Sequence, residues 1–200
     1  PGWLERESNF LHMTYKYLLG LLKAGLYDDF YEEMKTNFTC FMDPTIYGRS
    51  PIENSSFIAT SSNPDPKKQG QGFVARLSGS TAEVLSMMNM MFFGKELFKE
   101  VDQTLIFQPN PKLHHDFFDN GIIETKLFGQ IKVTYHNPHG LSTYDHALKI
   151  EKFVLITKDG EKVFNQAFVT GNWAKDIRNK NVLEIHVYYN KEENRWKRNF

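Results

Sequence analysis

The chain of 200 residues is 40% hydrophobic and 14% aromatic, which is enough apolar material for a buried core and unlike a disordered segment. Its 24 Lys and Arg balance 24 Asp and Glu, so charge indicates neither a nucleic-acid partner nor an anionic membrane surface. No apolar run approaches the roughly 20 residues that span a bilayer, and the single cysteine, Cys40, excludes an internal disulfide. We expect a globular, cytoplasmic protein with no nucleic-acid or membrane partner.

The N-terminal part of the chain predicts two helices joined by a short turn. Ser8 is a suitable N-cap for the first helix, and Gly25 suits its C-terminal end. The apolar stripe of this helix consists of Leu11, Tyr15, Leu18 and Leu22. The second helix is expected to begin at Asp28 and to stop at Asp43–Pro44. Its stripe consists of Phe30, Met34, Phe38 and Phe41. Helices joined by so short a turn should be antiparallel.

The segment 43–79 shows no strong periodicity. A stretch of this length usually marks a functional loop or an unrecognised element. A short helix can begin at Ser50–Pro51, where Glu53 takes the capping-box position. Beyond this segment, the residues from about 82 to 93 predict another helix, which Gly94 closes.

After residue 100 the sequence changes to short runs rich in β-branched and aromatic residues, separated by turn signals. The runs are TLIFQP, GIIETKLFG, QIKVTYHNP, ALKIEKFVLIT, KVFNQAFVT and NVLEIHVYY. Asp159–Gly160, between two of them, is a strong hairpin signal. The pattern predicts an antiparallel β-sandwich. We therefore predict an α+β chain, with a helical segment and long loop at 1–100 and a C-terminal β-sandwich at 101–200.

Two places in the helical segment carry residues suited to binding an anion. His12 lies near the start of the first helix, where unpaired N–H groups and the helix dipole favour negative charge. Ser78-Gly79-Ser80-Thr81 stands at the start of the third helix. A glycine in such a turn lets N–H groups and hydroxyls approach a phosphate closely, although P-loop spacing is absent. Each place has a structural alternative: His12 as a surface or core histidine, and the turn as an ordinary N-cap.

The loop sequence YGRSPIENSSF is dense in polar residues. Such density suits a sugar site, and it equally suits a long loop that bonds to its own backbone. Arg76 can make a forked contact to a phosphate or carboxylate, or it can form a structural ion pair. The weaker substrate-binding candidates are Arg49, Glu53, Asn54, Ser56 and Arg76.

The histidines of the second half do not predict a metal site. They are His114, His115, His136, His139 and His146. Their spacings match neither an H-x₃₋₅-H zinc pattern with cysteines nor an HExxH helix. Cys40 is expected to be a small core residue. No pair of carboxylates stands out as a general acid and base, so we predict neither a metal nor a paired-carboxylate mechanism.

Three motifs carry a resemblance to a known family: FLHMTYKYLLGLLKAGLYDDF, DPTIYGRSPIENSSFIATSSNPDP and GFVARLSGSTAE. They resemble the C-terminal part of inverting glycoside phosphorylases of the cellobiose phosphorylase family, and most closely the 1,2-β-oligoglucan phosphorylases and the related part of cyclic β-1,2-glucan synthases. The resemblance covers residues 1–94 and continues more loosely through GQIKVTYHNP. It implies that this chain supplies the closing helices of an (α/α)₆ barrel and the final β-sandwich.

The resemblance also implies an activity, the cleavage of a β-glucosidic bond by inorganic phosphate to give α-glucose 1-phosphate, without a metal or organic cofactor. Phe10-Leu11-His12 matches the family's aromatic-x-His setting for a phosphate-binding histidine. Leu77-Ser78-Gly79-Ser80 matches its phosphate-binding turn, with Ser78 at the ligand position. Some relatives place a glutamine upstream of the turn; the aligned Asn54-Ser55-Ser56-Phe57 has none, and Ser56 stands nearest.

The family's general acid is an aspartate well upstream of the histidine, so we expect it outside this sequence. Phosphate replaces the base-activated water, so one acid suffices. A chain that begins Pro1–Gly2 also suggests a piece of a longer protein. As such a piece, it would bind a β-glucan oligosaccharide and inorganic phosphate but be inactive alone. A barrel cut to a few helices should expose the Phe30, Met34 and Phe38 stripe. We therefore expect self-association or binding to the remainder of the barrel.

The alternative hypothesis is a non-catalytic carbohydrate-binding or structural β-sandwich module. In that case the aromatic residues near the C-terminus either form a sugar-stacking face or pack internally. These residues are Trp173, Tyr188, Tyr189 and Trp196.

Overall fold

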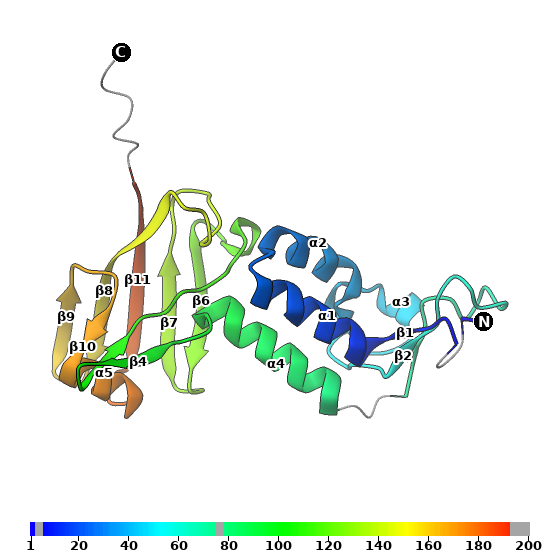
Figure 1. Ribbon diagram of the computed structural model, residues 1–200, viewed down its shortest axis with the longest axis horizontal. Coiled ribbons are helices and arrows are strands. Elements are labelled where there is room, and N and C mark those ends of the chain that lie inside the picture. The colour runs from blue at the N-terminus through cyan, green and yellow to red at the C-terminus, as the bar shows by residue number, and fades with distance from the viewer. Residues whose placement is uncertain (3–5, 75–77, 193–200) are drawn as a thin grey trace, which may run out of the picture. The chain divides into compact units, whose positions relative to one another are not determined.

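The computed structural model describes residues 1–2, 6–74 and 78–192 and shows an α+β chain (Figure 1). The chain divides into two units, Pro1–Asn89 and Met90–Phe200. The boundary falls within helix α4 (Ser78–Phe93), ahead of the change in sequence character near residue 100. No helix in the described ranges combines the length and apolar composition that crossing a membrane requires.

Two neighbouring helices, α1 (Leu11–Ala24) and α2 (Tyr27–Asn37), form the core of the first unit (Figure 1). The predicted stripe of α1 is buried along its whole length. Gly25 ends this helix with φ of 82°, a left-handed conformation in which a residue with a side chain is strained. Both predicted helices are therefore confirmed.

Three of the four residues of the second predicted stripe are buried, contrary to the sequence-based expectation, and only Phe41, beyond the end of α2, is exposed. Phe30, Met34 and Phe38 are all buried within the first unit. The ring of Phe38 lies 5.2 Å from that of Tyr15 on α1 and 6.5 Å from that of Phe30. The buried face of α2 therefore packs against α1, the preceding helix in the chain. No external helix is needed to cover this face of α2.

The helix boundaries in this unit differ from those predicted. Ser8 does not cap α1: its buried Oγ has no hydrogen-bond partner among the described residues, and Phe10 takes the N-cap position without a side-chain bond. The second helix ends at Asn37, and a 3₁₀ turn, η1 (Thr39–Phe41), follows. Asp43–Pro44 begins a short helix, α3 (Pro44–Tyr47), instead of ending one, since the Asp43 carboxylate accepts a bond from the Thr45 N–H at 2.8 Å.

The long segment after α3 contains strands where a helix was predicted. A three-stranded antiparallel ribbon joins β1 (Asn9–Phe10), β2 (Phe57–Ile58) and β3 (Gly72–Phe73). The proposed helix from Ser50–Pro51 is wrong, because these residues form turns that lead into β2. The backbone groups of this region pair across the ribbon and therefore have no need of a helix.

Helix α4 ends as predicted, at Phe93, and Gly94 follows with φ of 82°. Its last turn is fixed within the second unit, where the buried Tyr135 hydroxyl donates to the Phe92 carbonyl at 2.5 Å. The N–H of Asn110 also bonds to the Phe93 carbonyl at 3.0 Å. These bonds satisfy carbonyls that the end of a helix leaves unpaired.

The second unit is built on a five-stranded sheet in the order β6-β7-β11-β8-β9. The strands are β6 (Ile122–Leu127), β7 (Ile131–His136), β8 (Leu148–Thr157), β9 (Gly160–Phe164) and β11 (Glu184–Lys191). All neighbours are antiparallel except β11 and β7, which are parallel because the last strand inserts between two earlier ones. Asp159–Gly160 turns the hairpin between β8 and β9, as predicted.

A smaller antiparallel sheet in the order β10-β5-β4 completes the second unit. Its strands are β4 (Phe98–Val101), β5 (Thr104–Phe107) and β10 (Val169–Thr170). The buried rings of Phe107 on β5 and Phe153 on β8 lie 6.0 Å apart, so the two sheets contact each other there. The sequence missed β4 and the short helix α5 (Gly171–Arg178).

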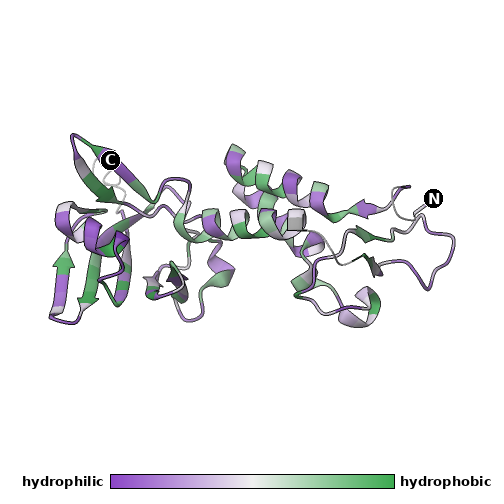
Figure 2. Cartoon of the chain, turned by 90° about the horizontal axis from the view of Figure 1, so that it is seen from below, coloured by the Kyte–Doolittle hydropathy of each residue, from purple (hydrophilic) through white to green (hydrophobic). Residues whose placement is uncertain are grey.

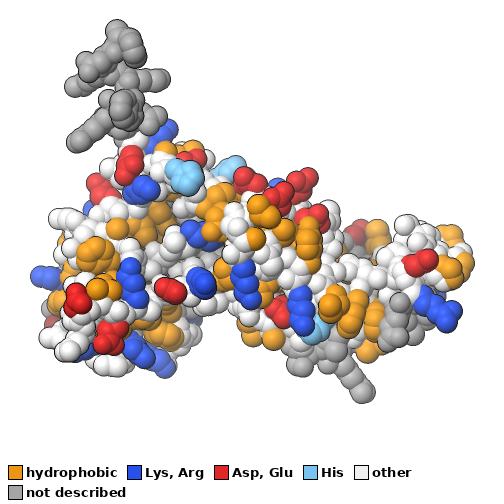
Figure 3. Space-filling model, in the orientation of Figure 1, with side chains coloured by type: hydrophobic (Ala, Val, Ile, Leu, Met, Phe, Trp, Pro, Cys, Tyr) orange, Lys and Arg blue, Asp and Glu red, His pale blue; other side chains and the backbone are white. Residues whose placement is uncertain are grey.

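Side chains alternate between the two faces of the larger sheet. Hydrophobic and hydrophilic residues follow one another along its strands (Figure 2). The buried face includes Val133, Tyr135, Phe153, Leu155, Ile185 and Val187. On the face shown in Figure 3, acidic and basic side chains are interspersed over this unit, in keeping with the balanced net charge.

Replacing Phe153 by alanine should destabilise the second unit by about 3 to 5 kcal/mol, because it removes a fully buried ring and leaves a cavity beside Phe107. Urea unfolding monitored by circular dichroism would measure the change. Phe168→Ala, at a ring that is 37% exposed, is the matched control and should cost less than about 1 kcal/mol. Equal losses would contradict the placement of the core.

Candidate functional site

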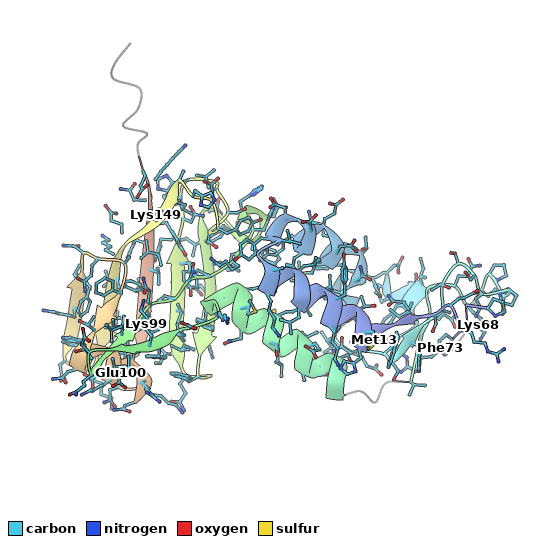
Figure 4. All side chains as sticks on the ribbon, in the orientation of Figure 1. Met13, Lys68, Phe73, Lys99, Glu100 and Lys149 are labelled. Atoms are coloured by element: carbon cyan, nitrogen blue, oxygen red, sulfur yellow. The ribbon has the colours of Figure 1, made fainter. Side chains whose placement is uncertain are left out.

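His12 lies directly against the start of helix α4, within the first unit. A Cβ placed on Gly79 would stand 2.6 Å from Cε1 of His12 and 2.8 Å from both ring nitrogens. Such approaches are too short for any real side chain, so the imidazole occupies space that the absence of a side chain at Gly79 leaves free. The structure thus brings together two of the sequence-predicted candidates. Met13, the residue after His12 on α1, is labelled in Figure 4.

The backbone of the ribbon sets the position of His12. The N–H of Leu11 donates to the Ser56 carbonyl at 3.0 Å, and the Ser56 N–H bonds to the carbonyls of Phe73 and Val74. These bonds hold the first turn of α1 beside the chain that leads toward α4. Phe73 on β3 is labelled in Figure 4.

The start of α4 offers the chemistry of an anion site. The first turn of a helix carries the positive end of its dipole, and no acidic residue stands in this first turn. The carboxylate of Glu83, one turn further on, lies 3.8 Å from Nε2 of His12. A protonated imidazole at this distance forms an ion pair, so Glu83 is a competitor for the contact that an anion would make.

The other residues of the predicted turn differ in their access to solvent. Ser80 is fully buried, and its hydroxyl is therefore not on the surface that faces an incoming anion. The side chain of Ser78 and the whole of Arg76 lie outside the described residues. Among the described residues, His12 and Gly79 are therefore the two predicted phosphate ligands that lie against each other.

Arg49 and Glu53 are engaged with the loop itself. Nη1 of Arg49 lies 2.8 Å from a carboxylate oxygen of Glu53, and its Nε donates to the Gly72 carbonyl at 2.8 Å. Both side chains are partly exposed, so the ion pair alone contributes little stability. The bond to Gly72 ties the loop to β3, which is an organising role within the loop.

Asn54 and Ser56 are likewise used internally. Oδ1 of Asn54 accepts from the hydroxyl of Tyr15 at 3.1 Å, and the buried Ser56 hydroxyl donates to the Val74 carbonyl at 2.6 Å. Between them, the buried Ser55 hydroxyl lies 2.5 Å from that of Tyr47. Of the two interpretations of this polar loop, the described contacts match the one in which the loop bonds to its own residues.

A cavity of about 330 Å³ in the first unit was not predicted from the sequence. This volume falls within the range of small-ligand sites. Its polar lining includes Asn9, Asp43, Tyr47 and Thr60, beside apolar residues such as Met42 and Ile46. The lining residues come from five separated segments, at positions 9, 36, 42–47, 58–60 and 70, so no local motif could have revealed the cavity.

The aromatic residues proposed for sugar stacking do not share a face. Tyr188 and Tyr189 are neighbours on β11 and point to opposite sides of the sheet, with Tyr189 buried. Trp173 on α5 packs its ring edge against Phe164, with centroids 6.0 Å apart. Trp196 lies outside the described residues. Tyr188 alone of the three described residues stacks on the half-exposed face, against His136.

Comparison with known proteins does not identify the chain. No protein-family model matches it, and no curated protein is significantly similar to it.

The burial of the Tyr15 hydroxyl predicts a pH dependence of stability. Burial raises the pKa of Tyr15 to about 12, from an ordinary value of about 10. The folded state therefore holds this proton more tightly, and the stability so gained is complete below pH ~10 and lost as the pH rises toward ~12. In Tyr15→Phe, the free energy of unfolding should fall by about 2 to 3 kcal/mol less between pH ~10 and pH ~12 than in the unmodified chain.

Urea unfolding of the Tyr15→Phe variant at several pH values between ~8 and ~12 would measure this effect, with far-ultraviolet circular dichroism as the signal. At neutral pH the variant should lose about 1 kcal/mol, because the bond to Asn54 is missing. The exposed Tyr17 provides the control Tyr17→Phe, which should follow the unmodified chain. An unchanged alkaline slope in Tyr15→Phe would show that this hydroxyl is not the source.

Proposed function

We propose that the chain supplies the phosphate-binding part of an inverting β-glucoside phosphorylase, which acts on a β-1,2-glucan or a related oligosaccharide. The observation that supports this most directly is the position of the His12 imidazole against Gly79 at the start of α4. A histidine and the N-terminal end of a helix form a suitable pair for a phosphate dianion. The motif resemblance from which we infer the substrate class involves the same residues.

In the proposed reaction, phosphate lies between His12 and the first N–H groups of α4. The imidazole and the N–H groups hold the phosphate oxygens, and one oxygen attacks the anomeric carbon from the face opposite the leaving glucosyl oxygen. Fixing the nucleophile in line lowers the entropic part of the barrier, so the contribution of these residues is positioning and charge stabilisation. A general acid from an upstream part of the barrel protonates the leaving oxygen, and the product is α-glucose 1-phosphate.

The same proposal assigns α1, α2 and α4 to the closing part of an (α/α)₆ barrel and the two sheets to a C-terminal β-sandwich. Exposed apolar side chains on two of the helices support further helical neighbours. On α1, Met13 and Tyr17 are 53% and 52% exposed; on α4, Leu85 and Met88 are 65% and 40% exposed. Their spacings of four and three residues place each pair on one side of its helix. The remainder of the barrel, or a second copy, would cover them.

A structural role for the same contact is the alternative, and Glu83 favours it. With its carboxylate 3.8 Å from Nε2 of His12, the pair can link α1 and α4 without any ligand. The chain would then be a non-catalytic module. The two functions differ in the effect of Glu83→Gln. Removing a negative charge beside a phosphate site should tighten phosphate binding, whereas removing half of a structural ion pair should only reduce stability.

Titration of the chain with inorganic phosphate, followed by the NMR signals of the Gly79 amide and the His12 ring, tests the proposal. We expect saturable binding that His12→Ala weakens by about 10- to 100-fold, the value of one charge-assisted hydrogen bond. Gly79→Ala should weaken it similarly, because the new methyl group displaces the imidazole. Circular dichroism of Gly79→Ala separates lost binding from lost folding, because the clash with the imidazole opposes the roughly 1 kcal/mol by which alanine favours helix over glycine.

His146→Ala, at an exposed loop histidine of the other unit, is the matched control and should bind phosphate like the unmodified chain. The proposal fails if phosphate does not shift either signal, or if Gly79→Ala and His12→Ala bind it normally. Glucose 1-phosphate released from β-1,2-glucan oligosaccharides by this chain alone would contradict the assignment of the general acid to another segment.

The exposed apolar side chains predict self-association of the isolated chain. Light scattering should give a mass above the 23.4 kDa of one chain at high protein concentration. The double variant Leu85→Glu/Met88→Glu should restore the monomer, because it places charge on the exposed side of α4. Val163→Glu, at a 44% exposed position on β9, is the control and should leave the self-association unchanged. A monomeric unmodified chain would show that these side chains need no partner.

A further inference from the structure

Two imidazoles and a carboxylate converge in a loop of the second unit, at the 3₁₀ turn η2 (His115–Phe117). Nδ1 of His114 lies 3.3 Å from one carboxylate oxygen of Asp116 and also accepts from the Asp116 N–H at 3.3 Å, and Nε2 of His115 lies 3.2 Å from the other carboxylate oxygen. One ligand atom from each of the three residues lies within 4.8 Å of the other two. The carboxylate therefore lies along the edges of the two rings, which pack against each other with centroids 4.0 Å apart.

A second loop fixes this cluster from outside. The N–H of His115 donates to Oγ of Ser142 at 3.2 Å, and Nδ1 of the same ring lies 3.4 Å from that oxygen. Thr143 pairs with Leu113 in both directions: its N–H bonds to the Leu113 carbonyl at 2.9 Å, and its hydroxyl accepts from the Leu113 N–H at 2.8 Å. A partner on the second nitrogen of a ligating histidine is the usual means of orienting it toward a metal.

These distances resemble the edges of a small coordination polyhedron. Around a tetrahedral zinc ion, with bonds of about 2.0 to 2.2 Å, neighbouring ligand atoms stand about 3.3 to 3.5 Å apart. The distances from the two imidazole nitrogens to the carboxylate, 3.3 and 3.2 Å, are close to this value; because they end on different oxygens of Asp116, the carboxylate would hold the ion with both oxygens. His115 is half exposed and Asp116 more so, which leaves coordination positions open to water. Two imidazoles with one carboxylate suit Zn²⁺, Co²⁺ or Ni²⁺ better than Mg²⁺ or Ca²⁺.

We propose that His114, His115 and Asp116 bind one divalent transition-metal ion of the zinc class. The ion replaces the Asp116 N–H as the partner of Nδ1 of His114, and it replaces the proton between His115 and the carboxylate, while Ser142 orients the His115 ring. The site is independent of the phosphate site, because its residues all belong to the second unit. It was not predicted from the sequence, since three consecutive ligands match no known zinc spacing.

The second histidine pair of this unit provides a matched comparison. Nε2 of His136 lies 3.0 Å from Nδ1 of His186, whose other nitrogen lies 3.4 Å from Glu184. Lys152, 4.4 Å from the stacked Tyr188 ring, places a positive charge near this pair, which disfavours a cation there.

Competition between the chain and a chromophoric zinc chelator tests the proposal. A Cys40→Ser background removes the exposed thiol as a competing ligand. We expect one Zn²⁺ per chain. His115→Ala and Asp116→Asn should each lower its affinity at least about 100-fold, and Ser142→Ala about 10-fold, as outer-sphere partners do. Co²⁺ in place of Zn²⁺ should show a visible absorption band that the same variants lose.

His186→Ala should leave both the stoichiometry and the affinity unchanged. Circular dichroism of each variant establishes that it is folded; His115 is half exposed, so its loss should be tolerated. A chelator that retains all the zinc would overturn the proposal. The proposal would also be overturned if His115→Ala and Asp116→Asn left the zinc affinity unchanged, or if His186→Ala abolished zinc binding. Retention of all zinc by the chelator, or an affinity unchanged in His115→Ala and Asp116→Asn, would mean that the carboxylate simply pairs with the two imidazoles.

Discussion

The backbone pairing of the β1-β2-β3 ribbon is the constraint on which the candidate phosphate site depends. A segment of this length cannot leave its N–H and C=O groups unpaired beside a buried core. Pairing β2 with β1 fixes the start of α1, and the bond from the Leu11 N–H to the Ser56 carbonyl aligns its first turn. His12 is the next residue, so its ring is held at the one place on α4 where glycine leaves room. The site is therefore a product of strand pairing more than of either helix alone.

The polar loop illustrates why residue type does not determine role. Arg49, Glu53 and Ser56 are residues that bind sugars and phosphates in many proteins, yet each is bonded to another part of the same loop or to β3. A loop that must remain ordered uses its own side chains for that purpose.

The second unit shows how one late strand reorganises a sheet. The run ending in Tyr188 and Tyr189 was predicted as a further antiparallel strand, but it inserts between β7 and β8 and is parallel to β7. This central position buries Ile185 and Val187 and leaves His186 and Tyr188 on the other face. The metal-site candidate lies instead on a loop, where Ser142 and Thr143 of a second loop hold it.

The sequence by itself determined the elements whose signals are local. The leucine stripe of α1, the glycine ends at Gly25 and Gly94, and the hairpin at Asp159–Gly160 follow from residues a few positions apart. It also indicated His12 and Gly79 as candidates, through a motif resemblance. Only the tertiary structure decided that these two touch, that the stripe of Phe30 is covered by α1, and that His114 and Asp116 face each other with Ser142 behind. Those outcomes depend on strand register and on which surfaces meet, and residues distant in sequence carry no local signal of either.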